Sequence, residues 1–330
     1  MKEVVEVDDS WTPEVLTIGR CSVDLYPLEV GVKLEDVATF GKFLGGSATN
    51  VAVAAARHGH GASVLTGVGD DPFGRFVIKE LGRLGVDASH VVTNAAFNTP
   101  VTFCEIFPPD DFPLYFYRQP TTPDLELTAA DLPSRIREYK ILWLTSSGLS
   151  VEPSRTAHHA AVSARTGGLS VLDLDHRPRF WSDEATATHE VGEMLARVDV
   201  AIGNIEECRV AVGETDPERA ADALLERGVD IAVVKQGMTG TLAKSRDERS
   251  FVPATRVKVL NGLGAGDAFG GALCHGLLDG WDLHRTIAFA SAAGAIVASR
   301  LECSTAMPTT TEVEALLGST GEPRPGHHLR

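Results

Sequence analysis

A short segment near the C-terminal end combines small residues with an acid: Asn261-Gly-Leu-Gly264-Ala265-Gly266-Asp267. Small residues let backbone N–H groups converge on an anion, and the helix expected over residues 267–278 adds a favourable dipole. A carboxylate at that place can accept the proton of an alcohol while a phosphoryl group moves to its oxygen. The segment therefore indicates phosphoryl transfer, although a plain glycine turn with an acidic helix cap explains it equally well when it is taken alone.

Two other phosphate-binding motifs are not found in the sequence. There is no G-x-x-x-x-G-K-[ST], which argues against a Walker-type ATPase. The glycines at 262, 264 and 266 do not follow G-x-G-x-x-G, and they come late in the chain, whereas a dinucleotide-binding fingerprint usually follows the first strand.

A second glycine-containing segment, Gly45-Gly46-Ser-Ala-Thr-Asn50, precedes an alanine-rich stretch. The two glycines permit close approach of the backbone to a ligand, and the Asn50 amide offers both a donor and an acceptor to sugar hydroxyls. Asp24 follows the strand expected over residues 15–19, and its carboxylate can accept two hydroxyl hydrogen bonds. Taken alone, the segment is more typical of a loop with a capping Asn.

Two arginines are candidates for binding an anionic substrate. Arg118 ends the segment FPLYFYR, and Arg177 follows the strand expected over residues 169–173, in the segment DLDHRPRFW. A guanidinium can bind a carboxylate through two hydrogen bonds, and desolvation in a closed cleft strengthens that pair. The alternative for each is a surface charge or an internal ion pair.

The elements that must position these residues follow an α/β rhythm. Val/Ile/Leu-rich runs at 15–19, 63–69, 141–146, 169–173, 198–204 and 231–237 alternate with alanine-rich helical patterns. This predicts a doubly wound, mostly parallel sheet flanked by helices, whose ligand lies at the carboxyl ends of the strands. Two stretches, about 25–44 and 86–125, break the rhythm and predict a small β-sheet lid. We expect one domain over residues 13–317, with disordered tails at 1–12 and 318–330.

Composition sets the broader limits. The 330 residues include 30 Lys+Arg against 45 Asp+Glu, for a net charge of −15, which argues against non-specific binding to nucleic acid or anionic membranes. We expect no transmembrane helix and no signal peptide. The five cysteines are scattered and odd in number, so a cytoplasmic protein with reduced thiols is expected.

Residues 45–59 and 262–273 resemble the two signatures of the ribokinase-like (PfkB-type) carbohydrate kinases, in the family's order. The resemblance extends over roughly residues 14–317. It implies the ribokinase-like fold with a β lid, ATP and Mg²⁺ as cofactors, and a cytoplasmic enzyme. It also implies the following roles: Asp267 as catalytic base; Gly264, Ala265 and Gly266 as the anion hole; and Asp24, Gly45, Gly46 and Asn50 as sugar-binding positions.

The same resemblance assigns a nucleotide side. Asn204-Ile-Glu-Glu207 resembles the family's N-x-x-E motif, in which Glu207 would help to hold Mg²⁺ indirectly. Lys235, Gly237 and Gly240 resemble the nucleotide-binding strand and turn. The resemblance also places Asn261 among the nucleotide-binding positions. Many members of the family have Asp at this position. The loss of that charge leaves activation by a monovalent cation open.

The same Asn occurs in one subgroup, the 5-dehydro-2-deoxygluconokinases of inositol catabolism, which residues 16–26, 34–40, 112–118 and 299–308 also resemble. Related sugar-acid kinases use a Y-R pair and a D-x-N-x-R segment, which match Arg118 and Arg177, with Asp175 replacing the Asn. We therefore expect phosphorylation of a primary hydroxyl of 5-dehydro-2-deoxy-D-gluconate. The alternatives are a 2-dehydro-3-deoxygluconokinase, a ribokinase or fructokinase, or a non-catalytic sugar-acid sensor. Family resemblance also implies a possible homodimer through the lid, since pairing would cover exposed strand edges.

Overall fold

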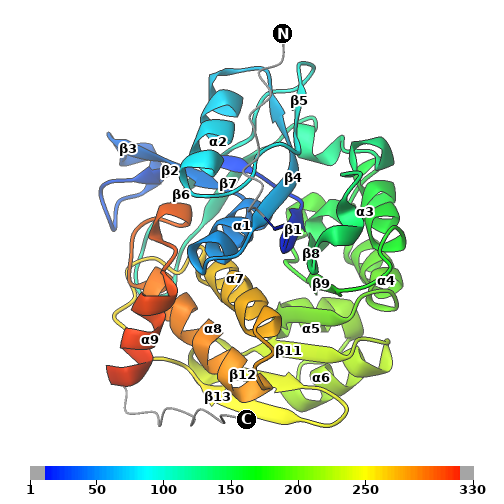
Figure 1. The fold of residues 1–330 in the computed structure, drawn as a ribbon. Coiled ribbons are helices and arrows are strands. Elements are labelled where there is room, and N and C mark those ends of the chain that lie inside the picture. Colours follow the sequence, from blue (N-terminus) through cyan, green and yellow to red (C-terminus); the bar gives the residue numbers. More distant parts are fainter. Residues whose placement is uncertain (1–11, 320–330) are drawn as a thin grey trace.

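The computed structural model describes residues 12–319, which form a large sheet between two layers of helices and a smaller sheet at one side (Figure 1). The predicted tails at 1–12 and 318–330 lie outside the described residues, except for Thr12 and for Gly318 and Ser319, which end the last helix. No helix among residues 12–319 is long and apolar enough to cross a membrane.

The large sheet has the strand order β13-β12-β11-β10-β9-β8-β1-β4-β5. Its strands are β1 (Val15–Ile18), β4 (Ala62–Gly69), β5 (Val91–Asn94), β8 (Ile141–Thr145), β9 (Leu169–Asp173), β10 (Val200–Asn204), β11 (Ile231–Lys235), β12 (Gly240–Lys244) and β13 (Arg249–Pro253). The strands from β11 to β5 pair in parallel, and β12 and β13 add antiparallel pairs. All six predicted strand runs are present. One assignment differs: β5 falls in the stretch predicted to belong to the lid, but it pairs with β4 in the large sheet.

Helices cover both faces of this sheet, which explains why its central strands β1, β4 and β8 are buried along their whole length. The helices are α1 (Ser47–Arg57), α2 (Pro72–Arg83), α3 (Ser154–Ser163), α4 (Glu184–Leu195), α5 (Ile205–Val212), α6 (Pro217–Glu226), α7 (Ala265–Leu278), α8 (Leu283–Ala298) and α9 (Thr310–Ser319). Side chains of α1, α2, α7, α8 and α9 share one core, and those of α3 to α6 share the other. On β1, Val15 belongs to the first core and Leu16 to the second, because successive side chains of a strand point to opposite faces.

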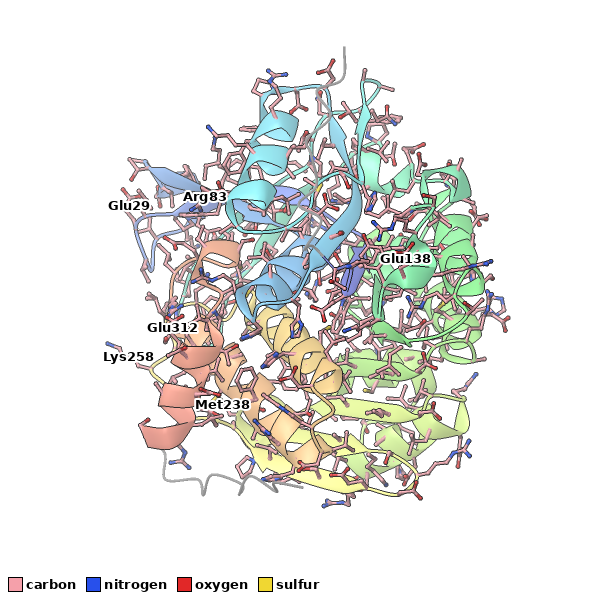
Figure 2. All side chains as sticks on the ribbon, viewed as in Figure 1. Glu29, Arg83, Glu138, Met238, Lys258 and Glu312 are labelled. Atoms are coloured by element: carbon pink, nitrogen blue, oxygen red, sulfur yellow. The ribbon has the colours of Figure 1, made fainter. Side chains whose placement is uncertain are left out.

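The lid is a four-stranded sheet with the order β3-β2-β6-β7. It consists of β2 (Ser22–Pro27), β3 (Phe40–Gly45), β6 (Val101–Cys104) and β7 (Leu114–Tyr117). The predicted hairpin is confirmed, since β6 and β7 pair antiparallel across a turn closed by Phe107 and Asp111. Glu29, in the turn between β2 and β3, lies at the free end of the lid (Figure 2).

All five cysteines lie within the described part of the chain, and each is free and buried. This agrees with the expectation of unpaired thiols.

Candidate functional site

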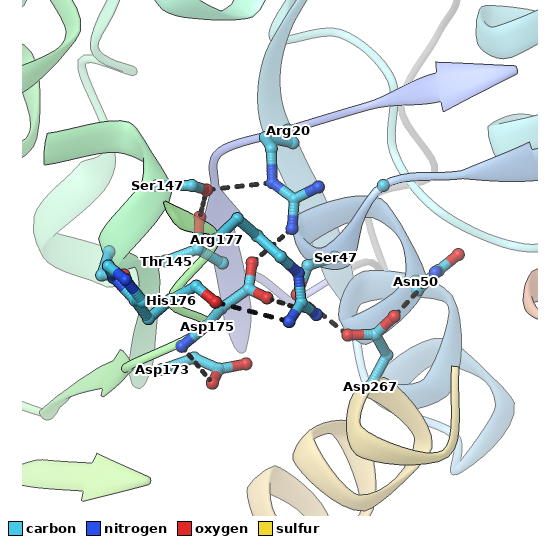
Figure 3. Close-up of polar contacts among 12 residues, drawn as sticks. Arg20, Ser47, Asn50, Thr145, Ser147, Asp173, Asp175, His176, Arg177 and Asp267 are labelled. Carbon is cyan, nitrogen blue, oxygen red and sulfur yellow. Dashed lines mark hydrogen bonds and ion pairs between the residues drawn. The ribbon is translucent and has the colours of Figure 1, made fainter. Parts of the chain in front are cut away.

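The two glycine-containing segments meet at the carboxylate of Asp267. Asp267 lies in the first turn of α7, and its Oδ2 accepts a hydrogen bond from Asn50 Nδ2 at 2.7 Å. Its Oδ1 accepts one from Ser47 Oγ at 2.9 Å (Figure 3). Ser47 and Asn50 lie in the first turn of α1, so the N-terminal ends of α1 and α7 converge. Burial raises the pKa of Asp267, although the Asn50 and Ser47 hydrogen bonds oppose that shift. The carboxylate is therefore held in place and is a stronger base than an exposed Asp.

The small residues before Asp267 leave the N-terminus of α7 open to an anion. Gly264 has a φ of +80°, a conformation that favours glycine, and a Cβ there would lie 2.6 Å from Cys303 Sγ. A Cβ at Gly266 would lie 3.5 Å from Lys235 Nζ, so the ammonium group of Lys235 lies beside this helix start. Backbone N–H groups and an ammonium at one place form a site suited to a phosphate.

The start of α1 leaves similar room for Asp24. A Cβ at Gly45 would lie 2.0 Å from Asp24 Cγ, and Gly46 has a φ of +97°. Asp24 accepts hydrogen bonds from Ser22 Oγ and, at 3.3 Å, from the Tyr26 hydroxyl. Burial raises the pKa of Asp24 to about 6.

Asp175 lies between two arginines (Figure 3). Arg20 forms a buried ion pair with it, and Arg177 Nη2 lies 2.9 Å from its Oδ1. Burial acts to raise the pKa of Asp175, but Arg20 and Arg177 outweigh that effect and lower it. Arg177 Nη1 also lies 4.0 Å from Glu207 Oε1, so two guanidinium groups lie near Asp267, with Asp175 and Glu207 as their acidic partners.

Arg20 was not among the predicted site residues. It follows the carboxyl end of β1 by two residues. Because ligands of such sheets lie at the carboxyl ends of the strands, the sequence could have identified it. Its Nε donates to Ser147 Oγ at 3.0 Å, and its guanidinium lies 5.2 Å from the centre of the Phe180 ring and 6.0 Å from that of Phe116. These contacts fix the direction of the guanidinium.

Arg118 does not face the site in this structure. Its Nη2 forms a buried ion pair with Asp124 and donates to Thr122 Oγ1 at 2.8 Å. It lines an outer hollow of about 660 Å³, which contains neither Asp267 nor the two arginines beside Asp175. The structure therefore places Arg118 in an internal ion pair, the alternative stated for it above.

A separate cavity of about 80 Å³ brings several of the predicted positions together. Its lining includes Arg20, Asp24, Asn50, Arg177, Gly264 and Asp267. Leu114 and Phe116 of the lid also line this cavity, as does Cys303, which was not predicted. Acceptor-binding groups, anion-binding groups and a candidate base thus surround one space.

The predicted nucleotide-binding residues include a helix cap and a glycine turn. Asn204 and Glu207 form a reciprocal capping box at the start of α5: Asn204 Oδ1 accepts from Glu207 N at 2.9 Å, and Glu207 Oε2 accepts from Asn204 N at 2.7 Å. The other oxygen, Glu207 Oε1, lies 4.0 Å from Arg177 Nη1 and faces the site. Gly237 and Gly240, both with positive φ, form the turn between β11 and β12.

Asn261 has a structural role. It is fully buried; its Nδ2 donates to the Leu301 carbonyl at 2.7 Å, and its Oδ1 accepts from Leu263 N at 3.0 Å. Both ends of its amide therefore hold the loop that leads into α7.

Comparisons with known proteins show what the chain as a whole is similar to. The family model described as "pfkB family carbohydrate kinase" matches residues 12–310. A curated protein named 5-dehydro-2-deoxygluconokinase, from Geobacillus thermodenitrificans, is 33% identical over 96% of this chain and 97% of its own length. A protein of the same name from Photobacterium profundum is 34% identical over 90% and 92%. The crystal structure of fructokinase from Vibrio cholerae, bound to fructose, ADP and a calcium ion, has a TM-score of 0.81 and 28% identity, over 93% of this chain and 99% of that one. The architecture is ribokinase-like.

Proposed function

Because this chain belongs to the pfkB family of carbohydrate kinases and is an ATP-dependent sugar kinase, we propose that its acceptor is 5-dehydro-2-deoxy-D-gluconate. The phosphoryl group is transferred to O6 of this sugar acid, as a step of inositol catabolism. The observation that carries this choice is that Arg20 and Arg177 line the same cavity as Asp267. The names of the curated relatives support it. We further infer that the protein acts in the cytoplasm.

A sugar acid suits the arginines of the cavity better than a neutral sugar does. Arg20 and Arg177 both line the cavity, and a guanidinium has five N–H donors, so donors remain for a substrate carboxylate beside the contacts with Asp175 and Glu207. A charge-assisted hydrogen bond in a desolvated cavity contributes about 1.5–3 kcal/mol, more than a neutral one. Asp24 and the second N–H of the Asn50 amide, whose Oδ1 already accepts from Ser304 Oγ, remain for hydroxyl groups.

The reaction uses the Asp267 carboxylate for the acceptor hydroxyl and the start of α7 for the phosphoryl group. Ser47 and Asn50 hold the Asp267 carboxylate so that one oxygen accepts the proton of the attacking hydroxyl. The N–H groups at the start of α7 and the Lys235 ammonium stabilise the charge on the phosphoryl group as it moves toward the acceptor oxygen. The lid side chains Leu114 and Phe116 exclude water from this space.

The side chains near Lys235 fit a Mg²⁺·nucleotide. The Glu207 Oε1 atom is not used by the helix cap, and Asp173 is a second buried acid close to Lys235, with a pKa that burial raises to about 8. Carboxylate oxygens and water are the ligands that Mg²⁺ prefers. When bound, Mg²⁺ would neutralise charge on the nucleotide phosphates, with Glu207 holding it through water.

The base is tested by Asp267→Asn. We expect kcat to fall by roughly 10²–10⁴-fold, because Asn cannot accept the proton, while the circular dichroism spectrum stays unchanged. Turnover is measured as ADP release with ATP·Mg²⁺. A folded variant with near-normal kcat would show that Asp267 is not the base.

The acceptor is tested with a panel of 5-dehydro-2-deoxygluconate, 2-dehydro-3-deoxygluconate, ribose and fructose. Arg177→Ala is expected to raise KM for the preferred acid about 10–100-fold, the loss of one charge-assisted hydrogen bond. Arg179→Ala, an exposed arginine two residues away, is the matched control and should leave KM unchanged. Preference for a neutral sugar, or an unchanged KM in Arg177→Ala, would overturn the sugar-acid proposal and leave the kinase intact.

A further inference from the structure

A second polar cluster lies at the C-terminal end of α7, the end opposite to Asp267. It contains His60, in the connection between α1 and β4, together with His275 and Asp279 at the end of α7. One potential metal-ligand atom from each of the three lies within 4.8 Å of the others. His275 is the eighth residue after Asp267, which is about 12 Å along the helix. The cluster is therefore separate from the catalytic carboxylate.

The contacts within the cluster already form a chain of polar groups. His60 Nε2 lies 2.8 Å from His275 Nδ1, and His275 Nε2 lies 3.9 Å from Asp279 Oδ2. On its other side, His60 Nδ1 lies 3.1 Å from Glu14 Oε2. Glu14 is itself fixed, because its carboxylate accepts from Gly61 N and from Lys140 Nζ. A carboxylate behind a histidine is the arrangement that orients ligating imidazoles in metal sites.

Aromatic neighbours hold the His275 ring. The ring centres of Trp281 and Phe289 lie 4.8 Å and 5.2 Å from it, and His58 stacks on it at 5.3 Å. The side chains of His60 and His275 are each 9% exposed, whereas that of Asp279 is 42% exposed, so the cluster opens to solvent on the Asp279 side.

We propose that His60, His275 and Asp279 bind a divalent transition-metal ion of the Zn²⁺ class, with solvent in the remaining position. Two imidazoles and a carboxylate are a common zinc ligand set, and His and Asp four residues apart on a helix are neighbours on one face. Zn–N distances of about 2.0 Å place tetrahedral ligand nitrogens about 3.3 Å apart. Binding therefore replaces the His60–His275 hydrogen bond and separates these rings by about half an ångström.

Other charges face the cluster from α8 and α9. The Arg285 guanidinium lies 3.7 Å from the centre of the Trp281 ring and opposes a cation, whereas the Glu314 carboxylate favours one. The ion would join the end of α7 to the connection before β4. Its expected role is to stabilise this corner of the fold.

The test uses the metal-stripped full chain with excess Mg²⁺ present, so that the acids of the catalytic site are occupied. ZnCl₂ is titrated by calorimetry, and CoCl₂ is titrated by visible absorption, which reports tetrahedral nitrogen and oxygen ligands. We expect one equivalent to bind and, at saturating Zn²⁺, a rise in Tm of about 3 °C or more.

The variants are His60→Gln and Asp279→Asn, with His189→Gln, an exposed histidine of α4, as the matched control. Affinity should fall at least tenfold in the first two and stay unchanged in the control. Because Asp279 is half-exposed, Asp279→Asn should fold, and it tests metal binding even if His60→Gln does not fold. Absence of stoichiometric binding, or wild-type affinity in Asp279→Asn, would overturn the proposal.

Discussion

At the scale of single residues, the candidate base depends on two neighbours for its charge state. Asn50 and Ser47 donate to the two oxygens of Asp267 and so stabilise its carboxylate form, while burial favours the protonated form. The acid must be deprotonated to accept a proton from the sugar hydroxyl. The pH at which activity is lost on acidification therefore reports the balance between these effects.

Ser47→Ala and Asn50→Ala each remove one of these donors and should raise the pKa of Asp267. The acidic limb of the kcat/KM profile, which reports the free enzyme, should move to higher pH in both variants. The shift should be greater for Asn50→Ala, because Asn50 has the larger lowering effect on that pKa. A limb that stays in place or moves to lower pH in both variants would show that Asp267 does not control it.

At the scale of elements, the site depends on the turn between β3 and the start of α1. Gly46 has a φ of +97°, and a Cβ there would lie 2.4 Å from the carbonyl oxygen of Arg20. Gly59 has a similar φ of +93°, but no heavy atom lies within 4 Å of its Cβ position. The two glycines therefore separate the cost of the backbone conformation from the cost of the clash.

Gly59→Ala should lower the free energy of unfolding by about 1–2 kcal/mol, the cost of a positive φ alone. Gly46→Ala should lower it by more, since the Arg20 backbone must also shift. It should reduce kcat as well, because α1 carries Ser47 and Asn50. Chemical denaturation and ADP release measure both effects. Equal losses of stability in the two variants would show that the contact at Gly46 costs nothing.

The sequence predicted those parts of the fold and site that local patterns determine. The runs that became β1, β4 and β8 to β11 are apolar because both faces are covered, and the segments around Asn50 and Asp267 combine glycine with a helix start. What it missed depends on the partner that each residue or strand chooses. Arg118 is held by Asp124, only six residues along the chain, whereas β5 pairs with β4 although it lies within the predicted lid stretch, and Arg20 faces Asp175, 155 residues away. Residue types and spacing alone do not determine these partners.

At the scale of the whole molecule, the lid has two unlike faces. Leu114 and Phe116 of β7 line the small cavity, whereas the Tyr117 side of that strand points away, with Tyr117 65% exposed. Leu28 and Val30, in the turn after β2, are also exposed. The lid strands β3 and β7 are the edges of their sheet. Exposed apolar side chains next to unpaired strand edges are typical of a surface that another chain covers.

We therefore expect the lid to pair with the lid of a second copy. Light scattering should give twice the chain mass of 35.2 kDa at micromolar concentration. Tyr117→Asp should shift the mass toward that of one chain, because a carboxylate would be desolvated in the interface. Val151→Asp, which charges an exposed apolar position before α3, should leave the mass unchanged. If the unaltered chain has the mass of a monomer at every concentration, the outer face of the lid is not a dimer interface. Loss of activity together with the dimer in Tyr117→Asp would further indicate that pairing holds the lid closed over the cavity that contains Asp267.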